Sequence, residues 1–239
     1  MYKENKYIEL PDKKQAIWRY MDFTSFVSII NSSSLHFTRV DQLPDPFEGS
    51  FPKGNVERRV DDNAQSEYYK KHVKYTFVSC WHINNLQSAA MWKLYLQSNE
   101  GIAIRSTVGR LIDSLVDRKY DIYIGQIEYI SYSKDLIREG SLSPYFHKRK
   151  SFEHERELRA LVQKYPRYKN GEINWGISPS NESGLNVNVD VNVLVEKVVL
   201  SPLCPSWQKE LVKSVLNKYE YDINVTRSTL YTRDERIVY

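Results

Sequence analysis

The strongest constraint on the fold is the spacing of apolar residues, which come in short runs that switch between a period of two and helical spacing. Residues 158–162 alternate in the first way, whereas Phe23, Phe26 and Ile30 recur at helical spacing. No run approaches the roughly 18 consecutive apolar residues that a membrane span needs. Strands outnumber helices without strict alternation. We therefore expect an α+β fold, with mixed strands in a central sheet or split sheets, flanked by several helices.

These patterns predict elements along most of the chain. Strands are expected over residues 16–21, 35–40, 75–81, 102–105, 122–130, 158–162, 186–195, 198–201 and 223–226. Helices are expected over residues 23–30 and 86–97, from Thr107 to Leu115, and after Pro205. Within 186–195, Val alternates with Asn and Asp, which is typical of a hairpin arm or an edge strand. The polar segment 53–72 is expected to be a mobile insertion of loop and helix on the surface.

The composition fits a single compact domain of 239 residues and 28.2 kDa. The 34 Lys and Arg residues exceed the 30 Asp and Glu residues by four, which gives a modest net positive charge. Only two cysteines are present, too few for a disulfide scaffold, and the first ten residues contain no apolar run of the kind that a signal peptide needs. We therefore expect a cytoplasmic protein that is not embedded in a membrane.

Positive charge is concentrated between residues 145 and 170, where eight Lys and Arg residues stand against three Glu residues. The stretch also holds aromatic rings, and proteins that bind single strands combine cations with rings that stack on bases. Four cations are therefore candidate contacts to nucleic acid or another anion: Lys148, Arg149, Lys150 and Arg159. The alternative is a solvated surface, because the sequence pI of 8.8 lies below the value of about 9 that is typical of nucleic-acid-binding domains.

Other motifs for chemistry are weak. Cys80 and His82 lie two positions apart on a predicted strand and would make half of a zinc site or a nucleophile pair. No second pair stands at ligand spacing, so we expect no metal and interpret Cys80 as a core residue. The common phosphate-binding, hydrolase and zinc-protease motifs are absent. Asp45 and Glu48 are either turn residues or an active carboxylate pair, and turn chemistry favours the first interpretation.

The densest set of titratable side chains lies in residues 150–159. Glu155 and Glu157 are two positions apart at the entry of a predicted strand, so both can face one substrate. Carboxylates in that position can stabilise a sugar-like cation during cleavage of a glycosidic bond, or bind a ribose hydroxyl. An ion-pair ladder in which Glu157 pairs with Arg159 explains the same pattern equally well.

Several motifs occur in a characteristic order. The first half of the chain carries Trp18-Arg19-Tyr20-Met21, Leu35-His36-Phe37, Asp45-Pro46-Phe47-Glu48 and Val78-Ser79-Cys80-Trp81. The second half carries Met91-Trp92-x-x-Tyr95, then Gly101-Ile102-Ala103-Ile104, and finally Phe152-x-x-Glu155-x-Glu157-x-Arg159. This order resembles the prokaryotic domain-of-unknown-function 2971 family over about residues 17–230. The chain departs from the family at Pro44, where Asn is frequent, and at Phe152, where Trp is frequent.

The same order is distantly similar to that of ADP-ribosyltransferases, in which a first strand offers Arg or His, a middle strand offers Ser or Tyr, and a late Glu begins a strand. The resemblance implies that Glu157, Glu155 and Arg19 are catalytic. It implies that NAD is bound by Arg19, Tyr20, Ser79, Trp92 and Tyr95. NAD would lose nicotinamide through an oxocarbenium-like ribose, and ADP-ribose would pass to a nucleic-acid or protein acceptor. The resemblance further implies a role in prokaryotic phage defence or as a toxin.

Two other hypotheses account for the same residues. A metal-dependent nuclease of a defence system would use Asp45, Glu48, Glu155 and Glu157, with Lys150 near the scissile phosphate. A non-catalytic sensor or partner-binding module would use the Val/Asn strand and exposed aromatic side chains for contacts, and its Glu/Arg pairs would be structural.

Overall fold

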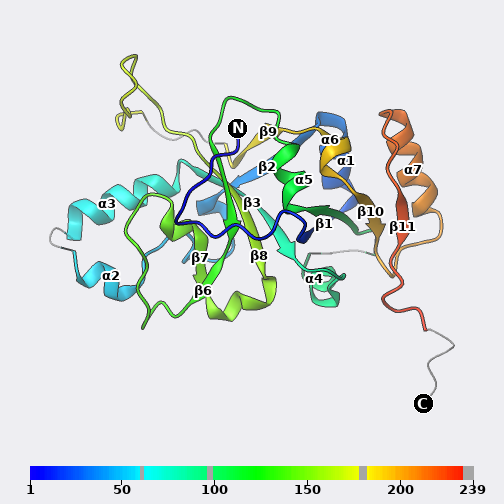
Figure 1. Ribbon diagram of the computed structural model, residues 1–239, viewed down its shortest axis with the longest axis horizontal. Helices are drawn as coiled ribbons and strands as arrows, with labels where there is room; N and C mark the ends of the chain where they lie inside the picture. The colour runs from blue at the N-terminus through cyan, green and yellow to red at the C-terminus, as the bar shows by residue number, and fades with distance from the viewer. Residues whose placement is uncertain (60–61, 96–98, 178–181, 234–239) are drawn as a thin grey trace. The chain divides into compact units, whose positions relative to one another are not determined.

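The computed structural model describes residues 1–59, 62–95, 99–177 and 182–233 (Figure 1). Contacts between Cα atoms group the chain into two compact units. The first unit comprises Met1–Pro11, Leu35–Cys80 and Asp117–Val187, and the second comprises Asp12–Ser34, Trp81–Val116 and Asn188–Tyr239. The single domain expected from the sequence stays a prediction. Among the described residues, no helix is long and apolar enough to cross a membrane.

The first unit contains a sheet with the strand order β9-β2-β3-β8-β5 and a separate parallel pair, β6 and β7. Its strands are β2 (Ser34–Arg39), β3 (Thr76–Ile83), β5 (Ile122–Gln126), β6 (Glu128–Ile130), β7 (His147–Arg149), β8 (Glu157–Gln163) and β9 (Gly184–Asn188). Its helices are α2 (Lys53–Glu57) and α3 (Asp62–Val73), with short 3-10 helices over Val40–Gln42, Ser143–Phe146 and Lys150–Glu155. Single residues at the ends of β2 and β9, and the last three of β3, belong to the second unit.

Strand β8 is central to the first unit. It pairs with β3 and runs antiparallel to β5, with Leu158 opposite Gln126 and Val162 opposite Ile122. All but the last residue of β8 are buried, and the apolar side chains Leu158, Ala160 and Val162 alternate with the charged side chains of Glu157 and Arg159, as the period of two predicts. The strand therefore carries two charges into the interior of the unit.

The second unit is built around strands in the order β11-β10-β4-β1-β3. Its elements are β1 (Ala16–Met21), α1 (Phe23–Ser32), α4 (Ala89–Tyr95), β4 (Ile102–Thr107), α5 (Val108–Asp113), α6 (Val191–Leu194), β10 (Lys197–Leu200), α7 (Gln208–Lys218) and β11 (Val225–Arg227). β1 pairs antiparallel with β4 over its whole length, whereas β10 and β11 are parallel, so the sheet is mixed. In Figure 1, α7 lies beside β11.

The α+β class, with mixed strands and several helices, is confirmed. Two predicted elements are wrong. The strand expected over 122–130 is two strands, β5 and β6, which pair with β8 and β7 respectively. Residues 186–195 do not form a single strand, because β9 ends at Asn188 and the side chain of Asp190 accepts a hydrogen bond from the Val193 amide, which caps helix α6. The alternating valines continue into a helical turn. The helix expected over 86–97 is α4, and positions 96 and 97 lie outside the described residues.

Candidate functional site

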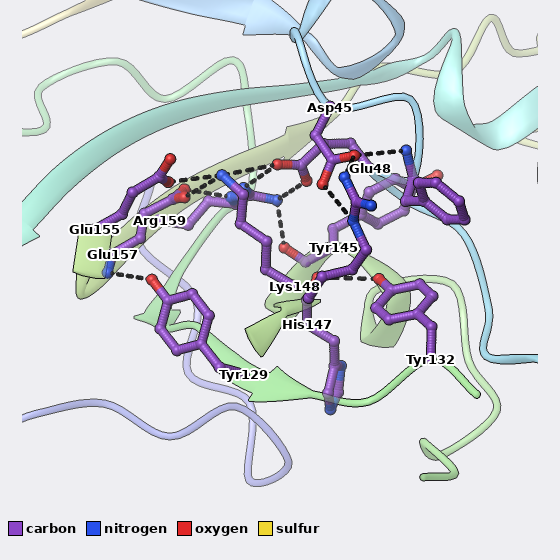
Figure 2. Close-up of polar contacts among 12 residues, drawn as sticks. Asp45, Glu48, Tyr129, Tyr132, Tyr145, His147, Lys148, Glu155, Glu157 and Arg159 are labelled. Carbon is purple, nitrogen blue, oxygen red and sulfur yellow. Dashed lines mark hydrogen bonds and ion pairs between the residues drawn. The ribbon is translucent and has the colours of Figure 1, made fainter. Parts of the chain in front are cut away.

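The candidate site is a group of seven charged residues in the first unit, which we call the ion-pair cluster (Figure 2). It joins the turn after β2, strand β7 and the start of strand β8. Its members are Asp45, Glu48, Lys148, Arg149, Glu155, Glu157 and Arg159. Four carboxylates and three cations leave the cluster with one formal negative charge.

The turn that supplies two of the carboxylates is fixed by its own backbone. The Phe47 amide donates to Asp45 Oδ1 at 3.1 Å, and the Glu48 amide donates to the Asp45 carbonyl at 3.1 Å. Gly49 follows with φ of +73°, and a Cβ there would lie 2.6 Å from the Tyr145 ring, so both the conformation and the space require glycine. The turn therefore directs the Glu48 side chain inward, where it is 3% exposed.

Arg159 is the buried centre of the cluster. Its Nη1 and Nη2 atoms donate to the two oxygens of Glu48 at 2.9 and 3.1 Å, a two-point pairing that the planar guanidinium favours. Its Nε donates to Glu157 Oε1 at 2.7 Å, and Nη1 also donates to the Tyr145 carbonyl at 2.8 Å. The side chain is fully buried. Arg159 thus joins strand β8 to a turn that lies 111 positions away in the sequence.

The Lys148 ammonium is shared by three carboxylates. Its Nζ lies 2.7 Å from Glu155 Oε2, 3.3 Å from Glu48 Oε1 and 3.5 Å from Glu157 Oε2. Burial opposes the charge, but Glu157 and Glu48 outweigh that effect and raise the pKa of Lys148 above its ordinary value. Lys148 therefore stays protonated over the physiological range and holds Glu155 in place.

The two glutamates at the start of β8 differ in exposure. The side chain of Glu157 is 4% exposed, whereas that of Glu155 is 17% exposed. Burial would raise the pKa of Glu157, but Arg159 and Lys148 lower it below its ordinary value, so this carboxylate is ionised at neutral pH. The Glu157 amide donates to the Tyr129 hydroxyl at 2.8 Å, which fixes the backbone where the strand begins. Glu155 lies at the edge of the cluster and Glu157 lies inside it.

The cations expected to contact an anion differ in position. Lys148 and Arg159 are buried, and carboxylates of the chain take up their charges. Arg149 pairs with Asp45 at 2.7 Å and stacks over Phe47, with its side chain 34% exposed. Lys150 is exposed. The anion contact expected from these residues stays a prediction, and their positions favour Lys150 over the others.

The remaining residues expected to bind NAD are divided between the units. Ser79 lies in the first unit on β3 and is 1% exposed. The other four, Arg19, Tyr20, Trp92 and Tyr95, belong to the second unit. There the Tyr20 and Trp92 rings pack in a buried cluster with centroids 4.9 Å apart, and Tyr95 is 49% exposed.

Arg19 and Tyr20 have further contacts in the second unit. The Arg19 guanidinium lies 5.7 Å from the Trp81 ring centroid. The Ser88 amide donates to the Tyr20 hydroxyl at 2.9 Å, and burial raises the pKa of Tyr20 to about 12. Packing therefore accounts for both Tyr20 and Trp92, and the ligand roles of all four residues stay predictions.

The carboxylates of the nuclease hypothesis do gather in one place, but a lysine occupies the position between them. The Lys148 ammonium contacts Glu48, Glu155 and Glu157, so a divalent ion bound to these three would have to displace it. In the described part of the chain, no group of three or more His, Cys, Asp and Glu residues is arranged to hold a metal.

Burial and the neighbouring Glu157 carboxylate raise the pKa of the Cys80 thiol, which disfavours the thiolate that metals and nucleophilic chemistry need.

Comparisons with known proteins identify no family. No protein-family model matches the chain, so membership of the domain-of-unknown-function 2971 family stays a prediction. No curated protein matches it. The chain is similar to the solved structure of Thermus sp. 2.9 DarT in complex with ADP-ribosylated single-stranded DNA, with 9% identity, a TM-score of 0.43, and coverage of 92% of this chain and 96% of that one.

A second structure of the same protein, Thermus sp. 2.9 DarT in complex with NAD+, is similar at 11% identity and a TM-score of 0.40, and the match covers 92% of this chain and 97% of that one. At these values the likeness assigns neither a residue nor an activity to this chain.

Proposed function

We propose that this chain is an ADP-ribosyltransferase-like enzyme that cleaves NAD and transfers ADP-ribose to a macromolecular acceptor. The observation that carries the proposal is the placement of two glutamates at the start of β8, where Lys148 holds Glu155 at the edge of the ion-pair cluster and Arg159 holds Glu157 inside it. The resemblance of the motif order to ADP-ribosyltransferases supports the same assignment.

The reaction needs a fixed carboxylate. The bond between nicotinamide and the ribose C1′ breaks, nicotinamide leaves with the bonding electrons, and positive charge develops on the ribose. A nucleophilic atom of the acceptor then attacks C1′ and loses its proton. A carboxylate that is already in place stabilises the developing cation without reorganising, as it does in other cleavages of glycosidic bonds.

Exposure favours Glu155 as the residue that contacts the substrate. At 17% exposure its carboxylate can reach a ribose, whereas Glu157 is enclosed by Arg159 and Lys148. We therefore assign Glu155 a catalytic role and Glu157 a positioning role. Glu157 fixes Lys148, and Lys148 in turn fixes Glu155.

A second candidate is a non-catalytic sensor or partner-binding module. The observation that favours it is that Asp45, Glu48, Glu155 and Glu157 are each paired with a lysine or arginine, as in a purely structural ion-pair network. On this alternative Glu155→Gln would leave the biological effect intact.

The resemblance to ADP-ribosyltransferases suggests a setting in phage defence or as a toxin. Expression of the protein in cells, followed by measurement of their growth, would test that setting.

The test is transfer of label from NAD to components of a cell lysate. Purified protein is incubated with NAD labelled in the adenylate moiety, and the products are treated with nuclease or protease to identify the acceptor class. Glu155→Gln should abolish transfer. Glu153→Gln, an exposed glutamate two positions away, serves as the matched control and should leave transfer unchanged. Transfer that survives in Glu155→Gln, or that is absent from the wild-type protein, would contradict the proposal.

A further inference from the structure

A hairpin arm, residues 164–177, follows β8 and projects from the first unit (Figure 1). Its two legs pair at Arg167 and Ile173, the Tyr168 amide donates to the Glu172 carbonyl at 2.8 Å, and Gly171 has φ of +90° at the turn. The legs therefore form a local structure, and residues 167–172 around its turn are exposed. Tyr168, near the tip, is 54% exposed.

A cluster of rings joins the base of the arm to helix α3. His72 of α3 is hydrogen-bonded through Nδ1 to the Tyr165 hydroxyl, and its ring lies 5.2 Å from that of Trp175 on the returning leg. Tyr68, one turn earlier on α3, contacts both His72 and Trp175, with centroids 4.1 and 5.7 Å away. The Lys164 amide donates to the Tyr75 carbonyl at 2.8 Å. The end of α3 and the arm thus form one surface.

This surface is strongly basic and its cations are exposed. Segments 67–74 and 164–175 together hold six Lys and Arg residues and two Glu residues, a net charge equal to the +4 of the whole chain. Lys71, Lys74 and Lys164 are exposed, and none of them has an ion pair with another described residue. Arg167 is also exposed, and its Nη1 donates to the Gly171 carbonyl. The cations on this face can therefore bind an anionic partner, whereas those of the ion-pair cluster are already paired with carboxylates of the chain.

We propose that this face, which we call the arm surface and define by Tyr68, Lys71, Lys74, Lys164, Arg167 and Tyr168, binds single-stranded nucleic acid. The cations supply contacts to successive phosphates. The two exposed tyrosines, Tyr68 at 43% and Tyr168 at 54% exposure, supply rings on which unpaired bases stack. A duplex keeps its bases stacked inside and cannot use the rings, so single strands are the better fit.

The proposal goes beyond the transferase function and does not depend on it, because binding is measured without NAD. Fluorescence anisotropy of labelled single-stranded DNA and RNA oligonucleotides is recorded at salt concentrations between 50 and 200 mM, beside a duplex of the same length and an oligoglutamate of similar charge. We expect the wild-type protein to bind single strands with about micromolar affinity at the lowest salt. Binding should weaken steeply as salt rises.

Two variants locate the site. The triple variant Lys71→Gln/Lys74→Gln/Lys164→Gln should make the slope of log affinity against log salt less negative by about 2. Tyr168→Ala should weaken binding of single strands by about tenfold, with little effect on the salt slope. The matched control Lys209→Gln/Lys213→Gln/Lys218→Gln removes three lysines from α7 and should retain wild-type binding.

Several results would overturn the proposal. The first is no binding of single strands at 50 mM salt. The second is equal weakening by the α7 triple variant, which would mean that net charge rather than the arm surface is responsible. The third is equal affinity for the duplex or for oligoglutamate, which would leave the tyrosines without a role. Far-ultraviolet circular dichroism of each variant checks that the fold is retained.

Discussion

The basic stretch between residues 145 and 170 supplies cations to both the ion-pair cluster and the arm surface, but the two regions use them in opposite ways. Lys148 and Arg159 are buried and touch two or three carboxylates each. Lys164 and Arg167, only a few positions later, are exposed and make no ion pair with any described residue. The cations at the start of this stretch therefore belong to an internal ion-pair network, whereas those near its end belong to the proposed binding surface.

The difference between the two regions shows that the number of cations in a segment does not tell how many of them can bind a partner. A cation is available to a partner only if the chain does not supply its counter-charge, and here the counter-charges of Arg159 come from Glu157 beside it and from Glu48 in a distant turn. Removing a charge should therefore have very different consequences in the two regions.

The largest effect on stability is expected for Arg159→Met. The substitution leaves Glu48 and Glu157 buried without their guanidinium partner, and breaking a buried pair in this way typically costs about 3–5 kcal/mol. Urea unfolding followed by circular dichroism measures the loss. A change below about 1 kcal/mol would mean that the cluster is more hydrated than its burial indicates.

An intermediate effect on stability is expected when the pH is lowered, because His72 lies buried in the ring cluster beneath the arm surface. Burial lowers the pKa of His72 to about 4, so the folded state keeps the ring neutral while the unfolded chain takes up a proton near pH 6.5. The stability that this residue contributes is therefore complete above pH 6.5 and declines as pH falls toward 4.

Between pH 7.5 and pH 5 the free energy of unfolding should fall by about 1–2 kcal/mol on this account. His72→Phe should remove that part of the decline, because phenylalanine does not titrate. Parallel urea titrations of both proteins at the two pH values give the comparison. The same pH dependence in the variant would show that other groups are responsible.

A smaller effect is expected for Tyr129→Phe. The Tyr129 hydroxyl accepts a hydrogen bond from the Glu157 amide, and its loss leaves that buried donor unsatisfied at a cost of about 1 kcal/mol. Thermal unfolding measures the change, with Tyr123→Phe as a control on the neighbouring strand. Equal melting temperatures for the wild-type protein and Tyr129→Phe would contradict the role given to this hydroxyl.

The smallest effect is expected on the arm surface. The triple variant Lys71→Gln/Lys74→Gln/Lys164→Gln should change the free energy of unfolding by less than about 0.5 kcal/mol, because exposed cations without partners contribute little to stability. Paired with the Arg159 result, this outcome would establish the contrast between the two regions. A loss of 2 kcal/mol or more would mean that these lysines support the fold.

Local pattern predicts most of the elements but little of the cluster. The period of two placed Glu157 and Arg159 on one face of β8, and the pairing between them was one of the two interpretations that the sequence allowed. Nothing in the sequence pairs Arg159 with Glu48, because the contact is made by a turn 111 positions earlier, whose inward direction depends on tertiary packing of Gly49 against Tyr145.

The same limit explains two other outcomes. The valines of 187–195 carry a strand pattern through a helical turn, because the capping side chain of Asp190 overrides the alternation. The sequence did not predict the arm surface, because its cations come partly from α3, which packs against the arm through the rings around His72. Charge availability depends on contacts that a linear pattern does not contain.

The transferase function is tested by the rate of nicotinamide release from NAD by the purified protein and by Glu155→Gln, with the free energy of unfolding measured on the same preparations. We expect the wild-type protein to release nicotinamide, and Glu155→Gln to do so at least about 100-fold more slowly while losing less stability than Arg159→Met. Equal release by the two proteins, or none by the wild type in the presence of lysate, would contradict the transferase function and leave the cluster a structural framework.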